Sequence, residues 1–379
     1  MLSSPSRAAV TSVLFVVDHL DSGGAPIVVR DLIKGMHQQG VAVTLVVLSD
    51  RVSHQLPEGV ELVTLPLTTK SRAERRQRYA LHARMLDDWF SRHGTEFGLV
   101  MAHLHHSHQV VSRSRLSDQA WYCLHSDPVT EFLGNKSGLS RWLKRRKVRA
   151  LYDHRKVVTV SHAALERLCQ IIGARPLVAR AIPNPVDIEQ VIRRSEEAVD
   201  DVPPQYLVFV GRMDLRAKRF DRLLDAYQAS ETVLPLILVG GGDQRAAVDS
   251  MIEARGLTTR VKTLGHRDNP YPYMRCASAL LLSSDYEGFS LVLVEALACG
   301  TPVVSVDCPT GPGEILIDEM RDYLVPVDDI AAFGSAIRRV LEVPPEIPQD
   351  ICLRFQLDTV VASYLALADL GSQRHASSR

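Results

Sequence analysis

The sequence lacks the cysteine patterns of a metal-binding or disulfide-stapled protein. Six cysteines occur among 379 residues, and none forms a C-x2-C pair or a His/Cys cluster with zinc spacing. Most of them lie within apolar runs, which is typical of buried thiols in a reducing compartment. The sequence therefore predicts no metal site and no disulfide framework.

Long hydrophobic runs are also missing. No stretch of 18 residues is continuously apolar, and the N-terminal MLSSPSRAAV has too short an apolar run for a signal peptide. The hydrophobic content of 46% and the charged content of 23% are typical of a soluble globular protein. We expect a cytoplasmic protein, or one peripheral to a membrane from the cytoplasmic side.

The net charge of zero hides an asymmetry. Residues 1–184 contain 25 Lys and Arg against 15 Asp and Glu, a net charge of +10, whereas residues 185–379 contain 19 against 29, a net charge of −10. A chain of this length usually forms more than one core. We expect one domain over residues 1–190 and a second over 203–353, with different partners and a charged, proline-ended linker at 193–204. An amphipathic segment at about 354–371 is long enough to return to the first domain.

The first half alternates strands and helices. Strand-like apolar runs occupy 11–17, 41–48, 60–65, 97–102, 120–124 and 157–160, and helical patterns occupy 25–39 and 72–90. Gly23 and Gly24 follow the first strand, where open α/β sheets bind ligands. G-x-G-x-x-G is absent, so this turn is not a dinucleotide fingerprint, and an ordinary tight turn explains the two glycines equally well.

Twelve of the fourteen histidines lie in the first half. His125 follows the strand at 120–124, where it could donate a hydrogen bond to a hydroxyl or a phosphate. Taken alone, any one of these histidines is more often structural. The cluster HLHHSH (103–108) has no acidic or cysteine partner that would give it a metal geometry, and we interpret it as a loop.

Residues 132–152 contain no acid and seven basic side chains, all between residues 136 and 149. Leu139, Trp142 and Leu143 add a broken apolar stripe at helical spacing. This pattern fits a helix lying on an anionic membrane surface. A solvated basic face whose Trp and Leu pack on the domain fits equally well. Nucleic-acid binding is less well supported, because one basic patch without a recognised fold gives no specificity.

The second half places cations after its first strand, 206–210. Arg212 follows that strand and Lys218 opens the next helix, so two cations and a helix N-terminus converge as they would on a diphosphate. The next strand, 236–239, ends in three glycines and Asp243. Glycine, cation and carboxylate at strand ends are what a nucleotide cleft requires.

The stretch SSDYEGFSLVLVEALACG (283–300) follows an apolar strand at 279–282. We expect Ser290 to cap the next helix and Gly300 to end it. Glu287 and Glu295 bracket a helix N-terminus whose backbone N–H groups favour an anion. A ligand with phosphates in its middle and hydroxyls at both ends, such as a nucleotide sugar, suits this layout. For an arbitrary E-x7-E pair, two solvated acids are the commoner explanation.

Six segments of the chain form a recognisable set: GG (23–24), VSHAALE (160–166), IPNPVD (182–187), VGRMDLRAKRFDRLLDA (210–226), LVGGGDQ (238–244) and EGFSLVLVEALACGTPVV (287–304). Together they resemble glycosyltransferase family 4. The resemblance implies the α/β GT-B fold: two Rossmann-like domains facing each other across a cleft, with a C-terminal helix crossing back to the first. It also implies a retaining, metal-independent transferase without a cofactor that takes its sugar from a nucleoside diphosphate.

By this resemblance, Arg212 and Lys218 correspond to a diphosphate clamp, Glu287 to the carboxylate on donor-sugar hydroxyls and Glu295 to the one on the ribose. His125 corresponds to the histidine near the reacting sugar, which makes His125, Glu287, Arg212 and Lys218 the expected catalytic set. The remaining expected donor contacts are the first-domain turn, the backbone that follows Glu287 and two residues flanking the base: Gly23, Gly24, Gly288, Phe289, Ser290, Leu291, His266 and Arg267.

DCPTGPGEIL (307–316) is similar to a segment of bacterial transferases that build lipopolysaccharide and lipid-linked glycans, but Gly313 stands where those usually have arginine. The resemblance implies a UDP-sugar donor and a glycan or lipid-linked acceptor. The basic segment at 136–149 predicts association with the anionic inner-membrane surface on its cytoplasmic face, and we expect no nucleic-acid partner. Two alternatives stay open: a transferase for a soluble acceptor of the glycogen or disaccharide type, and a non-catalytic nucleotide-binding module.

Overall fold

The computed structural model describes residues 10–21 and 23–372. The chain divides into two compact units, which we treat separately. The first contains residues 1–160, 165–185 and 357–379, and the second contains 161–164 and 186–356. Within the described residues, no helix is both long enough and apolar enough to span a bilayer.

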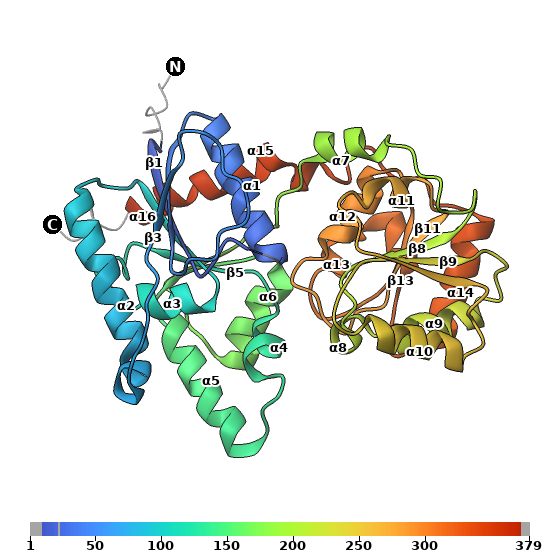
Figure 1. Cartoon of the computed structure of the whole chain (residues 1–379), viewed down its shortest axis with the longest axis horizontal. Coiled ribbons are helices and arrows are strands. Elements are labelled where there is room, and N and C mark those ends of the chain that lie inside the picture. Colours follow the sequence, from blue (N-terminus) through green and yellow to red (C-terminus); the bar gives the residue numbers. More distant parts are fainter. Residues whose placement is uncertain (1–9, 22, 373–379) are drawn as a thin grey trace. The chain divides into compact units, whose positions relative to one another are not determined.

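The first unit is built on a seven-stranded parallel sheet with strand order β3-β2-β1-β4-β5-β6-β7 (Figure 1). Side chains such as Leu14 and Val16 alternate along β1 with Val13 and Phe15, and all four are fully buried because helices cover both faces. The strands are β1 (Ser12–Val17), β2 (Ala42–Val47), β3 (Glu61–Thr64), β4 (Leu99–His103), β5 (Trp121–Leu124), β6 (Lys156–Thr159) and β7 (Val178–Ala181).

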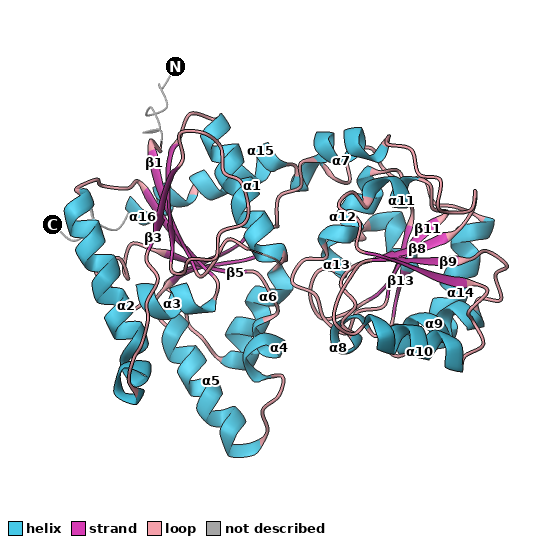
Figure 2. Ribbon diagram, viewed as in Figure 1, coloured by secondary structure: helices cyan, strands magenta, loops and turns pink. Residues whose placement is uncertain are grey.

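Local signals place several of the first unit's helices (Figure 2). Ser71 and Glu74 form a capping box at the start of α2, and Gly94 ends that helix in a left-handed conformation. The helices of the first unit are α1 (Gly24–Gln38), α2 (Arg72–His93), α3 (His105–Val111), α4 (Pro128–Leu133), α5 (Gly138–Tyr152), the π-helix η1 (Arg167–Ile172), α15 (Leu357–Leu365) and α16 (Leu367–Ser372). Helix α6 (His162–Glu166) is divided between the two units, because residues 161–164 are assigned to the second.

The C-terminal segment packs on the first unit, as predicted. A side chain at Gly35 of α1 would meet Val361 Cγ2 at 2.7 Å and Leu357 at 3.1 Å, so the glycine lets α15 approach closely. Apolar burial on both helices stabilises this contact, since Leu32 and Met36 of α1 and Val360, Val361 and Tyr364 of α15 are at most 1% exposed.

The second unit contains a six-stranded parallel sheet with strand order β10-β9-β8-β11-β12-β13. Its strands are β8 (Leu207–Val210), β9 (Leu236–Val239), β10 (Val261–Gly265), β11 (Ala279–Leu282), β12 (Val303–Val306) and β13 (Leu324–Val325). Its helices are α7 (Ile188–Ser195), α8 (Leu215–Lys218), α9 (Phe220–Ala229), α10 (Arg245–Ala254), α11 (Tyr271–Arg275), α12 (Leu291–Ala298), α13 (Pro312–Ile315), α14 (Ile330–Glu342) and the 3₁₀ turns η2 (Asp318–Tyr323) and η3 (Leu353–Phe355).

The parallel α/β class is confirmed, and three local predictions are wrong. The cluster 103–108 is not a loop, because His103 ends β4 and α3 begins at His105. Lys218 does not open a helix; it ends α8, and Arg219, at a φ of 48°, separates α8 from α9. Residues 193–204 are not all linker, because α7 runs to Ser195.

Candidate functional site

In the second unit, the candidate donor residues lie where the strand order reverses between β8 and β11. Chain connections leave these two neighbouring strands in opposite directions across the sheet, which opens a crevice at their carboxyl ends. The turn after β8 supplies Arg212, the short helix α8 that follows it supplies Lys218, and the turn after β11 supplies residues 283–290. The sequence-predicted residues of this unit therefore converge on one sheet edge.

Lys218 and Glu287 form the central contact. Lys218 Nζ donates to Glu287 Oε1 at 2.6 Å, and the two side chains are only 17% and 13% exposed. Ser284 Oγ donates to the same oxygen at 2.6 Å, and Ser283 Oγ donates to the Lys218 carbonyl at 2.7 Å. The two turns are thus tied together at backbone and side chain, while Glu287 Oε2 accepts no hydrogen bond from the described residues.

Arg212 is placed differently from Lys218. Its side chain is 74% exposed, and its Nη2 lies 3.2 Å from Asp214 Oδ2. Asp214 also accepts from the backbone N–H groups of Arg216 and Ala217. The N-terminus of α8 is therefore already occupied by a carboxylate, which corrects the expectation that it is open to a phosphate.

The N-terminus of α12 is the open one. No described group accepts from the backbone N–H groups of residues 288–292, which precede and begin this helix. Ser290 occupies the N-cap position, but its φ is 65° and its hydroxyl is buried without a partner, so the predicted side-chain cap is wrong. Gly300, at a φ of 79°, ends the helix as predicted. Unpaired amides and a helix dipole favour an anion here.

The predicted base and ribose contacts lie on neighbouring elements. Glu295 is on the second turn of α12 and accepts from Tyr271 Oη at 3.4 Å. His266 follows β10, and its Cβ lies 3.4 Å from the position that a side chain at Gly241 would occupy, so it borders the glycine turn after β9. Arg267 is held 2.8 Å from Asp201 and 3.0 Å from Tyr273 Oη, which keeps its guanidinium engaged within the protein.

The sequence did not predict two groups of contacts that hold this site together. Thr310 Oγ1 donates to the Glu287 carbonyl, and a side chain at Gly311 would lie 3.0 Å from the backbone of Phe289, so the DCPTGPGEIL turn packs directly on the 287–290 loop. Asp285 lies 2.8 Å from the buried Arg222 and 3.0 Å from Arg219. Asp285, Thr310 and Gly311 lie within the quoted stretches 283–300 and 307–316, but nothing in those stretches predicted these contacts.

In the first unit, the corresponding edge lies between β1 and β4. Gly23, at a φ of 115°, precedes α1 without a side-chain cap, and Gly24 begins that helix. Asp18, directly after β1, accepts from the N–H groups of His106 and Ser107 at 2.9 and 2.5 Å. Burial raises the pKa of Asp18 to about 6 despite these hydrogen bonds. The sequence reasoning did not single out Asp18, although DHLDSGG contains it.

His125 belongs to a buried pair of histidines. Its Nε2 lies 2.8 Å from His103 Nδ1, and the rings stack with centroids 5.1 Å apart. The Phe15 ring also stacks on His103, with centroids 5.4 Å apart. Burial lowers the pKa of His125 to about 4, so the ring is neutral at pH 7 and can exchange hydrogen bonds without carrying charge. Its Nδ1 is buried and meets no hydrogen-bond partner within the geometric limits among the described residues, although the Asn184 side chain lies near enough to oppose this lowering of the pKa.

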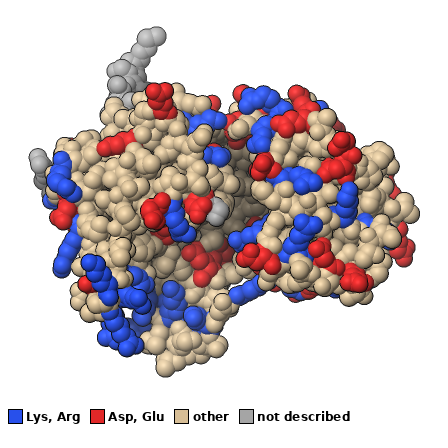
Figure 3. Space-filling model, in the orientation of Figure 1, with Lys and Arg blue, Asp and Glu red and all other residues tan. Residues whose placement is uncertain are grey.

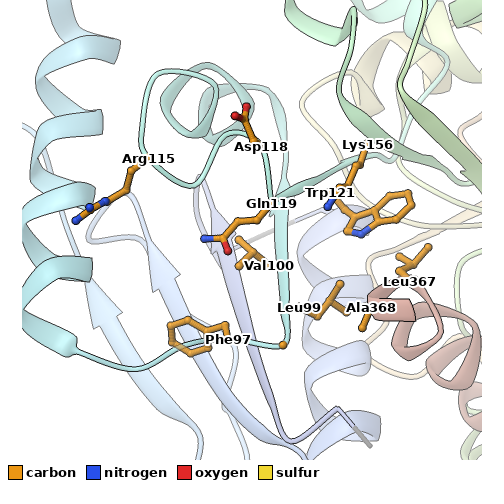
Figure 4. Close-up of a pocket in the computed structure, with 11 residues that line it drawn as sticks. Phe97, Leu99, Val100, Arg115, Asp118, Gln119, Trp121, Lys156, Leu367 and Ala368 are labelled. Carbon is orange, nitrogen blue, oxygen red and sulfur yellow. The ribbon is translucent and has the colours of Figure 1, made fainter. Parts of the chain in front are cut away.

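A pocket of about 430 Å³ lies at the opposite edge of the first sheet, where β4, β5 and β6 begin (Figure 4). Leu99, Trp121, Lys156 and Leu367 are among its lining residues. Since Asp18 and His125 follow the carboxyl ends of their strands, this pocket is separate from the candidate site. Among the described residues, no cluster of His, Cys, Asp and Glu could hold a metal ion.

The comparisons with known proteins decide the family. The family model described as "Glycosyltransferase Family 4" matches residues 22–190, and the one described as "Glycosyl transferases group 1" matches residues 204–343. The chain belongs to these glycosyltransferases. One relative of this glycosyltransferase is the N-acetylgalactosamine-N,N'-diacetylbacillosaminyl-diphospho-undecaprenol 4-alpha-N-acetylgalactosaminyltransferase of Campylobacter jejuni, 31% identical over 184 residues. That match covers 48% of the chain and 49% of the relative, so the glycosyltransferase aligns with about half the relative's length.

Solved structures confirm the GT-B fold of this glycosyltransferase. Sucrose-phosphate synthase from Thermosynechococcus elongatus superimposes with a TM-score of 0.74 at 20% identity, covering 97% of this chain and 100% of that one. A lipopolysaccharide outer core galactosyltransferase in its apo form gives a TM-score of 0.70 at 19% identity, covering 95% and 99%. The predicted resemblance to bacterial cell-envelope glycosyltransferases is confirmed.

Proposed function

We propose that this glycosyltransferase transfers a sugar from a nucleoside diphosphate donor, a UDP-sugar, to a glycan or lipid-linked acceptor in lipopolysaccharide or other surface-polysaccharide synthesis. The Lys218–Glu287 pair beside the unpartnered amides of α12 carries this proposal. A cation, a carboxylate and open N–H groups at one switch point match a ligand that has both phosphates and hydroxyls.

In this proposal each donor group has a partner within the second unit. Lys218, Arg212 and the amides of residues 288–292 hold the diphosphate. Glu287 keeps Oε1 on Lys218 and Ser284 and offers Oε2 to the sugar hydroxyls. Glu295, steadied by Tyr271, takes the ribose. His266 and the mostly engaged Arg267 flank the base.

The chemistry then needs no metal and no separate base. The acceptor hydroxyl attacks the anomeric carbon on the face that the diphosphate leaves, with retention of configuration, and the departing phosphate takes the proton. Lys218, Arg212 and the α12 dipole stabilise the charge that grows on the leaving UDP. Neutral His125 donates or accepts a hydrogen bond at the reacting sugar without placing a charge there.

The acceptor proposal draws on α5, the helix that contains the basic segment. Leu139, Trp142 and Leu143 are 71%, 50% and 46% exposed, so they do not pack on the domain as the solvated-face alternative requires. Exposed apolar side chains next to seven basic side chains are typical of a helix that lies at the surface of an anionic membrane. We place the enzyme peripherally on the cytoplasmic face of the inner membrane.

Membrane association is tested with vesicles. Replacing Leu139, Trp142 and Leu143 together with Ser should weaken binding to anionic vesicles by about 100-fold or more, since each buried apolar side chain contributes about 1.5–3 kcal/mol. Val233→Ser, which removes an 89% exposed valine from the second unit, is the matched control and should bind like wild type. Equal binding by the triple variant and wild type would contradict membrane association through α5.

A thermal-shift panel of UDP-, GDP- and ADP-sugars tests the donor. A ligand at a hundred times its dissociation constant stabilises the native protein by about 2.7 kcal/mol, which a melting curve detects. We expect the UDP-sugars to stabilise and one of them to be hydrolysed slowly. Stabilisation without hydrolysis or transfer would favour a non-catalytic module, and transfer to glycogen or a sugar phosphate would favour a soluble acceptor.

A further inference from the structure

A second pocket, of about 740 Å³, opens on the first unit between α2, α3 and α5. His105 lines it at the start of α3, and Ser112 and Arg113 line it just past the end of that helix. Since α3 starts two residues after β4 ends and Arg155 directly precedes β6, the pocket runs along α3 for roughly 10 Å, from the carboxyl edge of the sheet toward the edge where β6 begins. It therefore begins beside the edge that holds His125 and Asp18.

The lining of this pocket is cationic. It contains the side chains of Arg78, Arg113, Lys144, Lys147 and Arg155 and no Asp or Glu. Figure 3 shows Lys and Arg side chains gathered on this part of the first unit, over α2 and α5. Tyr79, Gln109 and Ser112 add neutral hydrogen-bonding groups. A volume of this size is that of a small-molecule site rather than of a surface irregularity.

Most of these cations have no ion-pair partner among the described residues. Arg155 pairs with Asp118 at 2.9 Å, but no described carboxylate lies within ion-pair distance of the other four. Arg78 and Arg113 instead stack on the Tyr79 ring, at 4.3 and 5.5 Å from its centroid. Burial lowers the pKa of Lys144, and Lys147 lowers it further, although Glu131 attracts this lysine from a distance. A bound anion would relieve this repulsion.

We propose that this pocket binds the phosphate or diphosphate group of the acceptor. The identity of the ligand as the acceptor rests on the proposed function, whereas anion binding by this pocket does not. Two features of the protein define how an acceptor would lie in the pocket. Its sugar end would react at the carboxyl edge of the sheet, and its lipid tail would enter the bilayer beside the exposed Leu139, Trp142 and Leu143 of α5. A lipid-linked glycan has its phosphates between those two ends.

The pocket is distinct from the donor site, because every residue that lines it belongs to the first unit, whereas Lys218, Glu287 and α12 belong to the second. Five cations around one concavity match a multiply charged phosphate better than a single carboxylate. The cations come from α2, from α5 and from the residues that follow α3 and α5, so their spacing is fixed by the fold.

The test compares two double variants that remove equal charge from one segment. Lys144→Gln with Lys147→Gln neutralises two lining lysines, and Lys136→Gln with Arg146→Gln neutralises two basic residues of the same segment outside the pocket. Inorganic pyrophosphate is titrated into the full-length protein by calorimetry with UDP saturating, so that the donor site is occupied. Circular dichroism and melting curves confirm that each variant is folded.

We expect pyrophosphate to bind wild type and the outside variant with affinities within about twofold, and the pocket variant about tenfold or more weakly, since one charge-assisted contact contributes about 1.5–3 kcal/mol. If both variants bind pyrophosphate equally weakly, the attraction comes from the overall positive charge of the segment and the proposed anion site is wrong. The proposal is also wrong if wild type does not bind pyrophosphate. If UDP itself fails to bind but pyrophosphate still depends on the lining lysines, the donor assignment fails and the anion site stands.

A second arm separates the two sources of phosphate. Neutral phosphatidylcholine vesicles with and without a polyprenyl diphosphate are mixed with wild type and both variants. Recruitment by the polyprenyl diphosphate that the pocket variant loses and the outside variant keeps supports the acceptor assignment. Pyrophosphate binding without any such recruitment overturns that assignment and leaves a site for a soluble phosphate.

Discussion

Removing the Lys218 side chain tests the centre of the donor site. In Lys218→Ala, Glu287 Oε1 keeps the hydrogen bond from Ser284 but loses its cation, whose Nζ lies 2.6 Å away. Because both partners are less than 20% exposed, the orphaned carboxylate should lower the free energy of unfolding by about 1–3 kcal/mol. Loss of the charge that faces the leaving diphosphate should lower kcat by about 100- to 1000-fold.

Two further variants separate catalysis from folding. Arg216→Ala removes a cation from the same short helix without touching Glu287 and should leave kcat and stability near wild type. The double variant Lys218→Ala, Glu287→Gln removes the orphaned charge and should recover most of the lost stability but none of the activity. Steady-state kinetics of nucleotide release at saturating donor measure kcat, and urea unfolding measures stability.

The reasoning fails if Lys218→Ala turns over at a rate close to wild type with donor saturating, because the lysine would then only support the loop. It also fails if the double variant regains activity along with stability, since the single variant's defect would then have been one of folding. Loss of affinity alone, with kcat unchanged, would mean that Lys218 binds donor and transition state equally.

Three other predictions concern pH, positioning and metal. Burial raises the pKa of Asp18 from 3.8 to about 6, so between these pH values the native protein keeps a proton that the unfolded chain has lost. The unfolding free energy of wild type, measured in urea, should therefore fall relative to that of Asp18→Asn as pH rises from about 4 to about 6. The same pH dependence in both proteins would contradict the raised pKa. His103→Phe keeps the stack on Phe15 but removes the hydrogen bond to His125, so kcat should fall about five- to tenfold with little change in donor KM, and a change in KM alone would exclude a positioning role. Activity should survive excess EDTA, because cations already face the diphosphate, and a complete loss restored by Mg²⁺ would contradict this mechanism.

The fold class and most strands follow from the sequence because parallel strands are buried on both faces. Leu236–Val239 and Ala279–Leu282 are continuous apolar runs, and the structure places β9 and β11 at those bounds. Edge strands are harder to predict. β7 (Val178–Ala181) contains Arg180 and leaves it exposed, and β13 has only two residues, so neither produces an apolar run.

The residues of the candidate donor site could be grouped from the sequence, but the contacts between them could not. Arg212 and Glu287 follow the ends of β8 and β11, and Lys218 and Glu295 lie on the short helices that come next, so the parallel topology groups all four at one edge. The direct Lys218–Glu287 contact depends instead on Arg219 adopting a positive φ and on Ser283 binding the Lys218 carbonyl. Backbone conformations of that kind have no signature in the composition of a turn.

The histidine cluster shows most clearly why the rest could not be read from sequence. HLHHSH has no N-cap residue of its own, and Leu104 at the cap position makes no side-chain hydrogen bond, so nothing local predicts a helix at His105. The cap comes from Asp18, 88 residues earlier, whose carboxylate accepts from His106 and Ser107. That contact begins α3 at the sheet edge, and α3 in turn forms one wall of the cationic pocket. The cap of α3 is a residue that follows a different strand, and the pocket is lined by separate helices. Both features exist only once the sheet has formed.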